Sequence, residues 1–484
     1  MATDMTGFKR SLTLLDAVML VAGSMIGSGI FIVSADMLRQ LGSPAWMITA
    51  WVVSGVMTVL AALSYGELAA MMPKAGGQYV YIQRAFGRLP AFMYGWTVFT
   101  VIQTGLIAAV AVAFAKYTAV FVPALGEGVI LLDLGFLQVN ASQLVAIASV
   151  VLLTAFNARG VRNGKLLQTS FTLAKIIALL GLIAAGLWLG GGTGVWSTNF
   201  SGGWEATGLR TAADGTEGHV PLSGLLLVSA FGVALVGSLF SSDAWNNVTF
   251  IAGEIDRPQR NIPLGLVLGT ALVTVLYLLA NFAYLALLPT VDIQHALADR
   301  VGAAAAAVIF GDQGALIMAG LIMVSTFGCN NGIILSGARL YYAMAQDGLF
   351  FRRAGELNKA AVPGFALWVQ CVWASLLCLS GRYGDLLEYT MFASLLFYIV
   401  TIAGLFVLRV REPHAQRPYR AWGYPVLPAI YILAAAAFCI NLLWSKPLYT
   451  GFGLGIVALG AVVYAAMPRR AKEAGAGTAA SSHG

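Results

Sequence analysis

GSMIGSGIF, the stretch Gly23–Phe31, lies in the middle of the first apolar run of this 484-residue chain. It places three glycines and two serines where a continuous buried helix would carry large apolar side chains. A second stretch, FSSDAWNN at Phe240–Asn247, places two serines, an aspartate and two asparagines inside the sixth apolar run. Main chain that leaves a helix at membrane depth is tolerated only where protein buries it or where it lines a cavity. We therefore expect two helices that are broken near mid-depth.

The composition indicates that lipid surrounds much of the protein. The chain is 59% apolar and 10% charged, whereas a soluble domain carries about 25% charged residues. Its apolar runs are long enough to cross about 30 Å of hydrocarbon as helices, and the alternating pattern of a barrel is absent. We predict an all-α polytopic membrane protein of about twelve spans. The spans are expected near 13–40, 45–71, 90–121, 141–157, 166–190, 222–252, 263–289, 314–345, 364–381, 385–408, 424–444 and 449–467.

The basic residues predict the orientation. Most of them fall on one side of the membrane if the N-terminus is inside, as the positive-inside rule requires. Both termini are therefore expected to be cytoplasmic, in the cell inner membrane. We interpret the net charge of +7 as this topology signal and not as nucleic-acid binding. The first span follows Lys9 and Arg10 but is too long for a signal peptide, so we interpret it as retained.

The two broken spans also predict the domain organisation. They open two successive five-span units, residues 11–192 and 222–410, and 421–468 supplies helices eleven and twelve. Residues 1–470 then form one transmembrane domain, and the small, polar tail 471–484 is expected to be disordered. Paired interruptions at corresponding places indicate a transporter binding site. The alternatives are small-residue packing for the first stretch and hydrogen bonds between helices for the second.

Five segments resemble those of one known family. They are GSGIF (Gly27–Phe31), SYGELAAMMPKAGGQYVYIQRAFG (Ser64–Gly87), AWNNVTFIAGEIDRPQRNIP (Ala244–Pro263), STFGCNNGIILSGARLYYAMAQDG (Ser325–Gly348) and RPYRAWGYPVLP (Arg417–Pro428). In this order they resemble the amino acid–polyamine–organocation (APC) superfamily, and most closely the L-amino acid transporter (LAT) branch in its bacterial form. The resemblance implies twelve helices, a LeuT-like five-plus-five inverted-repeat core and a site between broken helices one and six. We expect no cofactor and no metal.

The resemblance also implies which residues bind a zwitterionic amino acid. Freed N–H groups at the start of a half-helix suit its carboxylate, and unwound carbonyls suit its ammonium. The expected carboxylate cradle is Gly27, Ser28 and Gly29. The expected ammonium acceptors are the carbonyls of Met25, Ile26, Phe240, Ser241 and Asp243. Phe240 is expected to be the lid, and Cys329 and Ser394 to line the side-chain pocket.

Three further residues are candidates for coupling or gating. Lys175 lies far from either end of the fifth span and forms a polar stripe with Gln168 and Thr172. The family holds a lysine here, where sodium-coupled relatives hold sodium, so we expect it to tie helix five to helices one and eight or to carry a proton. The alternative is an inert lysine bonded to carbonyls. Glu67 and Glu254 belong either to an inner gate or to ordinary helix ends.

These features predict a secondary active transporter of neutral L-amino acids, working by sodium-independent exchange or proton-coupled uptake. Ser242 and Ala244 stand where many relatives have an aromatic residue and a glycine, which favours small substrates. Asp243 supports the alternative, a basic amino acid or polyamine antiporter; a channel or receptor is more distant. The sequence has no enzyme motif, and its four histidines lie outside the spans. Its four cysteines fall within spans and none lies between Phe121 and Ala141, so we expect no covalently linked heavy subunit.

Overall fold

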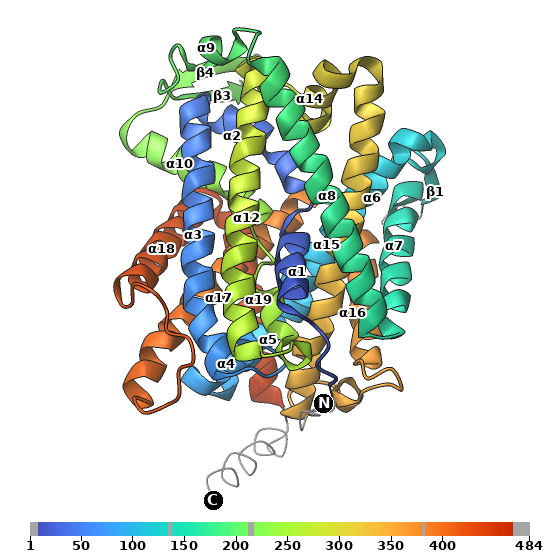
Figure 1. Cartoon of the computed structure of the whole chain (residues 1–484), viewed down its shortest axis with the longest axis vertical. Helices are drawn as coiled ribbons and strands as arrows, with labels where there is room; N and C mark the ends of the chain where they lie inside the picture. Colours follow the sequence, from blue (N-terminus) through green and yellow to red (C-terminus); the bar gives the residue numbers. More distant parts are fainter. Residues whose placement is uncertain (1–7, 134–137, 212–216, 380–382, 468–484) are drawn as a thin grey trace, which may run out of the picture.

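The computed structural model describes residues 8–133, 138–211, 217–379 and 383–467, which form an upright bundle of helices (Figure 1). The predicted tail 471–484 lies outside the described residues. We call the face with the N-terminus and the short helix α4 the N-terminal face. The opposite face, which carries α9, β3, β4 and α14, is the far face (Figure 1).

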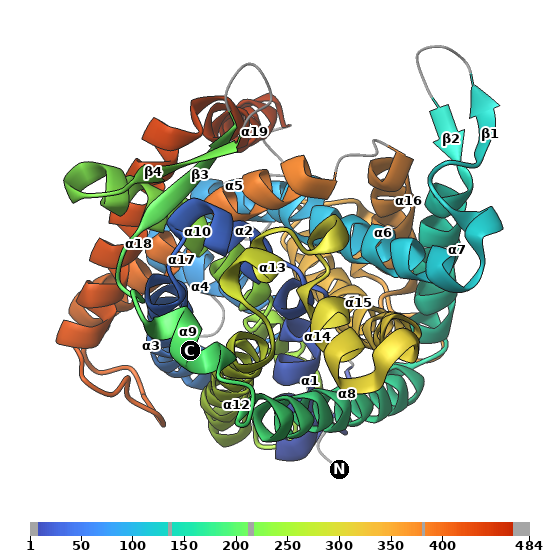
Figure 2. The same cartoon turned by 90° about the horizontal axis from the view of Figure 1, so that it is seen from above.

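The chain up to the second break contains two short hairpins among its helices. Its elements are α1 (Leu14–Met25), η1 (Gly29–Phe31), α2 (Val33–Leu41), α3 (Pro44–Met71), α4 (Gln78–Phe86), α5 (Arg88–Thr97), η2 (Val98–Ile102), α6 (Gln103–Phe121), η3 (Pro123–Leu125), β1 (Ile130–Asp133), β2 (Gln138–Asn140), α7 (Ala141–Ala158), α8 (Val161–Gly190), α9 (Val195–Phe200), β3 (Thr207–Thr211), β4 (Glu217–Pro221) and α10 (Gly224–Ser241). Strands β1 and β2 pair antiparallel, as do β3 and β4. The β1–β2 hairpin extends outward from the bundle (Figure 2).

The remainder of the chain is helical. Its elements are α11 (Asn247–Phe250), η4 (Ala252–Glu254), α12 (Pro258–Leu287), α13 (Thr290–Gln294), η5 (Leu297–Asp299), α14 (Val301–Phe310), η6 (Gly311–Gln313), α15 (Gly314–Gln346), η7 (Arg352–Gly355), α16 (Gly364–Leu379), α17 (Tyr383–Arg411), α18 (Val426–Ser445) and α19 (Pro447–Ala466).

The prediction of an all-α polytopic membrane protein is confirmed. Among the described residues, nine helical stretches are long and apolar enough to cross a membrane, and three shorter apolar helices accompany them. Two expected starts were late. Helix α8 begins at Val161 and α12 at Pro258, each five residues before the predicted start. The predicted start of the second of these spans was Pro263, which lies inside α12.

Local sequence signals explain how the first spans begin and turn. The Thr13 hydroxyl accepts a hydrogen bond from the N–H of Asp16, whose carboxylate accepts one from the N–H of Thr13, a capping box that starts α1. Gly42 ends α2 in the left-handed conformation, with φ of 58°. Ser43 caps the next helix, and Pro44 occupies its first turn, where a missing N–H costs nothing. The chain therefore reverses sharply between α2 and α3.

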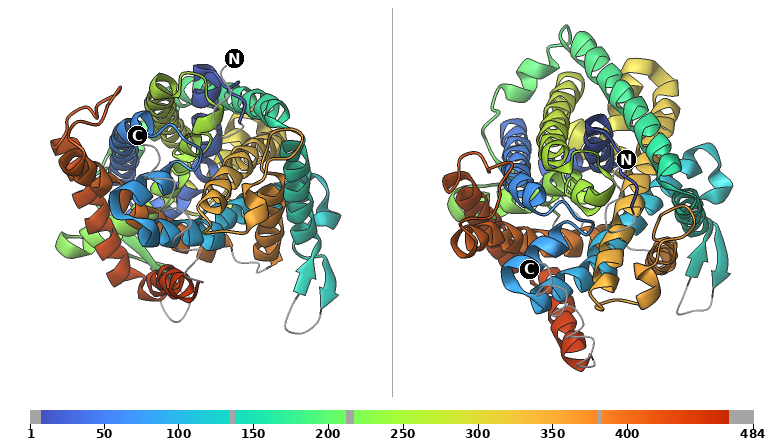
Figure 3. Two further views of the ribbon diagram at one scale, coloured as in Figure 1. Left: turned by 90° about the horizontal axis from the view of Figure 1, so that it is seen from below. Right: turned by 60° about the horizontal axis from the view of Figure 1, so that its bottom comes forward.

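The two broken helices run antiparallel to each other. Helix α1 contacts α11, and α10 contacts α2, so the first half of each broken helix lies beside the second half of the other. Seen from the N-terminal face, α1 lies beside α12 and α8, both of which it contacts (Figure 3). The two breaks consequently face each other inside the bundle.

A buried ion pair lies between the second break and the N-terminal face of the protein. Arg339 Nε donates to Glu254 Oε1 at 2.9 Å, and the two side chains are 0% and 1% exposed. The Glu254 carbonyl also accepts hydrogen bonds from the N–H groups of Ser11 and Leu12. The segment before α1, the end of the sixth span and α15 are thereby joined at one residue.

We predict that Glu254→Gln destabilises the protein strongly. The substitution leaves the Arg339 charge buried without a counter-charge, and breaking one side of a buried pair costs about 3–5 kcal/mol. Thermal unfolding of the detergent-solubilised protein measures the effect. The matched control is Glu412→Gln, which removes the partner of Arg84 from a pair whose side chains are 31% and 46% exposed. That control should cost about 1 kcal/mol or less, and equal losses in the two variants would contradict the argument.

Candidate functional site

The first break presents main-chain donors. Helix α1 ends at Met25, and the chain stays unwound until the single turn η1 begins at Gly29. Within the described residues, the N–H groups of Gly27 and Gly29 make no hydrogen bond. Buried N–H groups are almost always paired in folded proteins. These two donors are therefore available to an anionic group of a ligand.

The second break presents a carboxylate and a strained main chain. Helix α10 ends at Ser241, and α11 begins at Asn247. Between them, Ala244 adopts a positive φ of 64°, a conformation that favours glycine. Tyr398 donates its hydroxyl to Asp243 Oδ1 at 2.5 Å. Ala244, which stands where many relatives have a glycine, thus has a backbone conformation typical of glycine.

The two breaks contact each other directly. Tyr277 of α12 places its hydroxyl 2.9 Å from the carbonyl oxygen of Met25 and 3.0 Å from that of Ser241. A Cβ atom on Gly29 would lie only 2.9 Å from the Cβ of Ser241. Glycine is therefore needed at position 29, because any side chain would push the two breaks apart.

A small cavity of about 20 Å³ lies between the breaks. Its lining residues are Ser24, Met25, Gly27, Ser28, Gly29, Leu106, Val110, Phe240, Ser241, Asp243, Ala244, Cys329 and Ile333. Eight of the ten predicted substrate-binding residues are in this set. The other two, Ile26 and Ser394, are not.

Ile26 is turned away from the cavity. Its carbonyl accepts hydrogen bonds from Lys175 Nζ at 2.7 Å and from Ser325 Oγ at 3.0 Å. Ser394 is buried in α17, and its hydroxyl has no hydrogen-bond partner among the described residues. Met25 and Ser241 line the cavity, and their carbonyls lie within reach of the single hydroxyl proton of Tyr277, with which a ligand ammonium would share them.

Sequence reasoning missed part of the cavity wall. Leu106 and Val110 come from α6, Ile333 from α15, and Ser24 from the last turn of α1. The only available signal was spacing: Leu106 and Val110 are four residues apart, as are Cys329 and Ile333, so each pair shares a helix face. Apolar residues at that spacing occur on every span of this chain, which is why the signal did not single them out.

Lys175 joins three helices. Its Nζ donates to the carbonyls of Gly23 at 2.6 Å, Ile26 at 2.7 Å and Ser325 at 3.3 Å. The side chain is 3% exposed, and all three protons of its ammonium have an acceptor. Two of these carbonyls were freed by the first break. Lys175 thus ties α8 to α1 and α15.

The rest of the polar stripe on α8 also faces the bundle. Thr172 Oγ1 donates to the Met19 carbonyl at 3.2 Å, and Gln168 Oε1 accepts from Asn331 Nδ2 at 2.9 Å. The same two side chains lie where a Cβ on Gly23 would be, so this glycine allows α1 and α8 to pack closely. The small-residue packing considered for Gly23 is therefore present, beside the break and not in place of it.

The two candidate gating glutamates lie in charged clusters away from the cavity wall. Glu254 pairs with Arg339, as described above. Glu67 accepts from Arg409 Nη2 at 2.6 Å and from the N–H of Ala421 at 2.7 Å, and lies 3.2 Å from Arg417. Phe240, the expected lid, lines the cavity and is 8% exposed. Among the described residues, no group of three His, Cys, Asp or Glu side chains could hold a metal ion.

Comparison with known proteins identifies the family. The amino acid permease family model matches residues 12–464. The chain belongs to the amino acid permease family. This permease is 31% identical over 461 residues to human "Large neutral amino acids transporter small subunit 2", covering 94% of the chain and 80% of that protein.

Two other relatives are similar over comparable lengths. Mouse "b(0,+)-type amino acid transporter 1" is 29% identical over 442 residues, with 90% of the permease and 82% of the relative covered. "Serine/threonine exchanger SteT" of Bacillus subtilis (strain 168) is 27% identical over 473 residues, with 97% and 99% covered. The resemblance inferred from the five sequence segments is confirmed.

We predict that Gly29→Leu abolishes amino acid binding and leaves the protein folded. Its Cβ would strike Ser241 and separate the walls of the cavity. A thermal-shift screen against amino acids is the measurement, because a ligand at about 100 times its Kd stabilises by about 2.7 kcal/mol. The shift seen for the wild type should disappear in Gly29→Leu.

Two further variants make this test specific. Gly181→Leu, at a lipid-facing glycine of α8 with open space around its Cβ position, should keep the full shift. Gly29→Ala should weaken binding, and adding Ser241→Gly should restore part of it. Unchanged binding by Gly29→Leu would move the site away from the first break.

Proposed function

We propose that this permease is a secondary active transporter that exchanges small neutral L-amino acids without sodium. The observation that carries the proposal is a single small cavity that offers unpaired main-chain donors and carbonyl acceptors together. A zwitterion needs this combination. The relatives named above are transporters and an exchanger of amino acids by name, and we assign the permease no catalytic reaction.

The donors at the first break support binding of the substrate carboxylate. The N–H groups of Gly27 and Gly29 line the cavity and have no partner within the described chain. Hydrogen bonds from N–H to a carboxylate are charge-assisted and stronger than those between neutral groups. The substrate ammonium then lies toward the unwound carbonyls of Met25 and Ser241 and toward the Asp243 carboxylate.

The apolar wall supports a small side chain. Leu106 and Val110 of α6 and Ile333 of α15 close the cavity opposite the breaks. A Cβ on Gly27 would already lie 3.3 Å from Cys329 Sγ. A cavity this tight favours alanine or serine over large side chains.

Lys175 supports independence from sodium. Sodium would need the main-chain oxygens that the Lys175 ammonium already occupies, namely those of Gly23, Ile26 and Ser325. The Lys175 ammonium would repel a second cation there, and that cation would lack the oxygen ligands that the ammonium already occupies. Coupling, if present, then runs through exchange or through a proton.

We further propose the membrane and the orientation. The excess of Lys and Arg near the N-terminal face favours a cytoplasmic position for this face and for both termini, in the cell inner membrane. We also propose that no heavy subunit is linked covalently, since the four cysteines are buried in helices.

Asp243 favours a second candidate function. Its carboxylate lines the cavity, and within the described residues it forms no ion pair; its side chain accepts from the neutral Tyr398 hydroxyl. A buried carboxylate without a cation is suited to a basic amino acid or a polyamine. The small cavity volume is the observation against this alternative.

We predict exchange of labelled alanine into proteoliposomes preloaded with unlabelled alanine. Initial rates should be equal in sodium and choline buffers, because Lys175 holds the cation position. Excess unlabelled serine should compete, whereas arginine and putrescine should not. Transport of arginine or putrescine without any neutral amino acid would establish the second candidate, and a steep loss in choline would contradict the role given to Lys175.

We predict that Lys175→Ala slows transport more than it weakens binding. The ammonium latches α8 to α1 and α15, so its loss should impair the switch between inward- and outward-facing states. Net uptake and exchange should both fall, while affinity changes by about tenfold or less, about 1.4 kcal/mol. Lys165→Ala, at a half-buried lysine on the same helix paired with Asp16, is the control.

The same variant separates the two roles of Lys175. Retained exchange with loss of pH-driven accumulation would identify a proton carrier. Wild-type exchange and wild-type pH dependence together would reduce Lys175 to a structural residue.

A further inference from the structure

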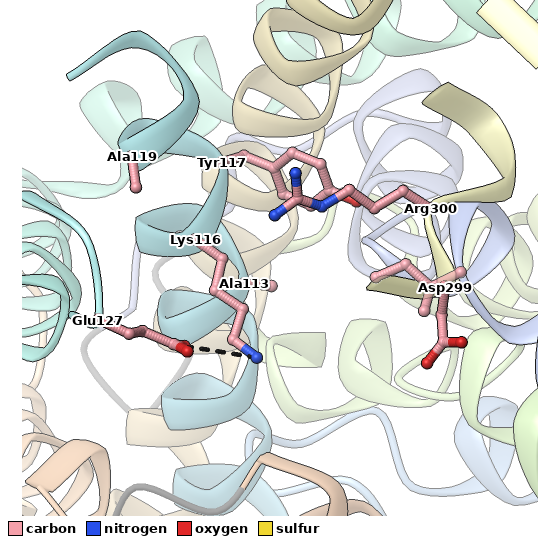
Figure 4. A pocket seen from close by; sticks show the side chains of 8 residues that line it. Ala113, Lys116, Tyr117, Ala119, Glu127, Asp299 and Arg300 are labelled. Atoms are coloured by element: carbon pink, nitrogen blue, oxygen red, sulfur yellow. Dashed lines mark ion pairs between the residues drawn. The ribbon is translucent and has the colours of Figure 1, made fainter. Parts of the chain in front are cut away.

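A second pocket, of about 320 Å³, lies near the far face, beside the start of α14 (Figure 1). Figure 4 shows it from close by. Its lining residues are Ile32, Ala113, Lys116, Tyr117, Ala119, Glu127, Asp299 and Arg300. They come from the residue after η1, the last turns of α6, the loop before β1, and the segment that joins η5 to α14. The predicted amino acid site includes none of them.

The charges in and beside this pocket balance, because Arg39, which pairs with Asp299, also lies 3.7 Å from Asp36, but Arg300 stands outside the ion pairs. Asp299 Oδ1 is paired with Arg39 Nη1 at 2.7 Å, and Glu127 lies 3.4 Å from Lys116 Nζ. The Arg300 guanidinium forms no ion pair or hydrogen bond within the described chain. It lies over the Tyr117 ring, 5.2 Å from its centroid, while the Asp299 carboxylate points away from it (Figure 4).

Helix α6 connects this pocket to the central cavity. Leu106 and Val110 line the cavity, and Ala113 and Tyr117 line the pocket. Their spacings of four, three and four residues place all four on one stripe of the helix. Val110 and Ala113 are only about 4.5 Å apart along the helix axis. The first broken helix spans both spaces too, with Gly29 in one and Ile32 in the other.

We infer that the far-face pocket is a transient binding site for the amino acid on its way to the central cavity, with Arg300 holding the carboxylate. A guanidinium matches a carboxylate with two parallel hydrogen bonds, and stacking on Tyr117 keeps its fork in place. Glu127 or Asp299 is available to the substrate ammonium once its own ion pair loosens. The inference rests on the proposed amino acid exchange and adds a second binding step on one side of the membrane.

Arg300→Gln tests this inference through the difference between the two faces. Alanine exchange is measured in proteoliposomes of known orientation, with labelled substrate presented first to the far face and then to the N-terminal face. The KM at the far face should rise about three- to fivefold, the weight of a partly exposed charge pair. The maximal rate and the KM at the N-terminal face should not change. Raising the ionic strength should shrink the difference from the wild type, because salt screens exposed charges.

Two variants separate carboxylate binding from a general field effect. Arg300→Lys keeps the charge but loses the fork, so its KM should lie between those of the wild type and Arg300→Gln. Lys446→Gln removes a positive charge between α18 and α19, outside the pocket, and should leave both KM values unchanged.

The outcomes are distinct. Equal KM changes at both faces, or none at either, would overturn the far-face site and leave amino acid exchange standing. If Lys446→Gln raised the far-face KM as much as Arg300→Gln, Arg300 would act only through its charge and not by binding the carboxylate. That result would also overturn the site. If the wild type exchanges no amino acid, the proposed function fails and this inference fails with it.

Discussion

Main-chain groups freed from a helix at membrane depth have no water to bind, and this constraint governs the centre of the permease. Both breaks release carbonyls. Tyr277 contacts those of Met25 and Ser241, and Lys175 and Ser325 both donate to that of Ile26. These three side chains lie on α12, α8 and α15, three helices that surround the first break. The unwound segments are therefore stabilised by polar side chains that would be costly anywhere else in the bundle.

The two kinds of main-chain group are treated differently. The carbonyls nearest the first break already have donors, whereas the N–H groups of Gly27 and Gly29 have no acceptor among the described residues. A carboxylate can bind to these donors without displacing a protein group. An ammonium must use the second lone pair of an occupied carbonyl or the carboxylate of Asp243. In the proposed function, the carboxylate is thus the end of the substrate whose hydrogen-bond partners are free in advance.

Charged residues outside the cavity join helices to one another near the N-terminal face. Glu254 joins α15 to the segment before α1, and Glu67 joins α3 to α17 and to the loop before α18. Both are buried, so each charge depends on its partners for stability. Neither contacts the central cavity. Their ion pairs hold helices and connecting segments together away from the residues that line the cavity.

Sequence alone determined which segments cross the membrane, where two of them break, and that Lys175 points into the protein. Each of these conclusions depends on the cost of a polar or flexible residue at a given depth, which is a local property of the chain. It also identified most of the residues at the breaks, through their resemblance to one family. Only the tertiary structure decided that Ile26 faces Lys175, that Tyr277 bridges the breaks, and that Leu106, Val110 and Ile333 close the cavity. In lipid an apolar helix has no hydrophobic face that distinguishes the core from the membrane, so the rotation of each helix, and with it every contact between helices, had to come from the packing of the whole bundle.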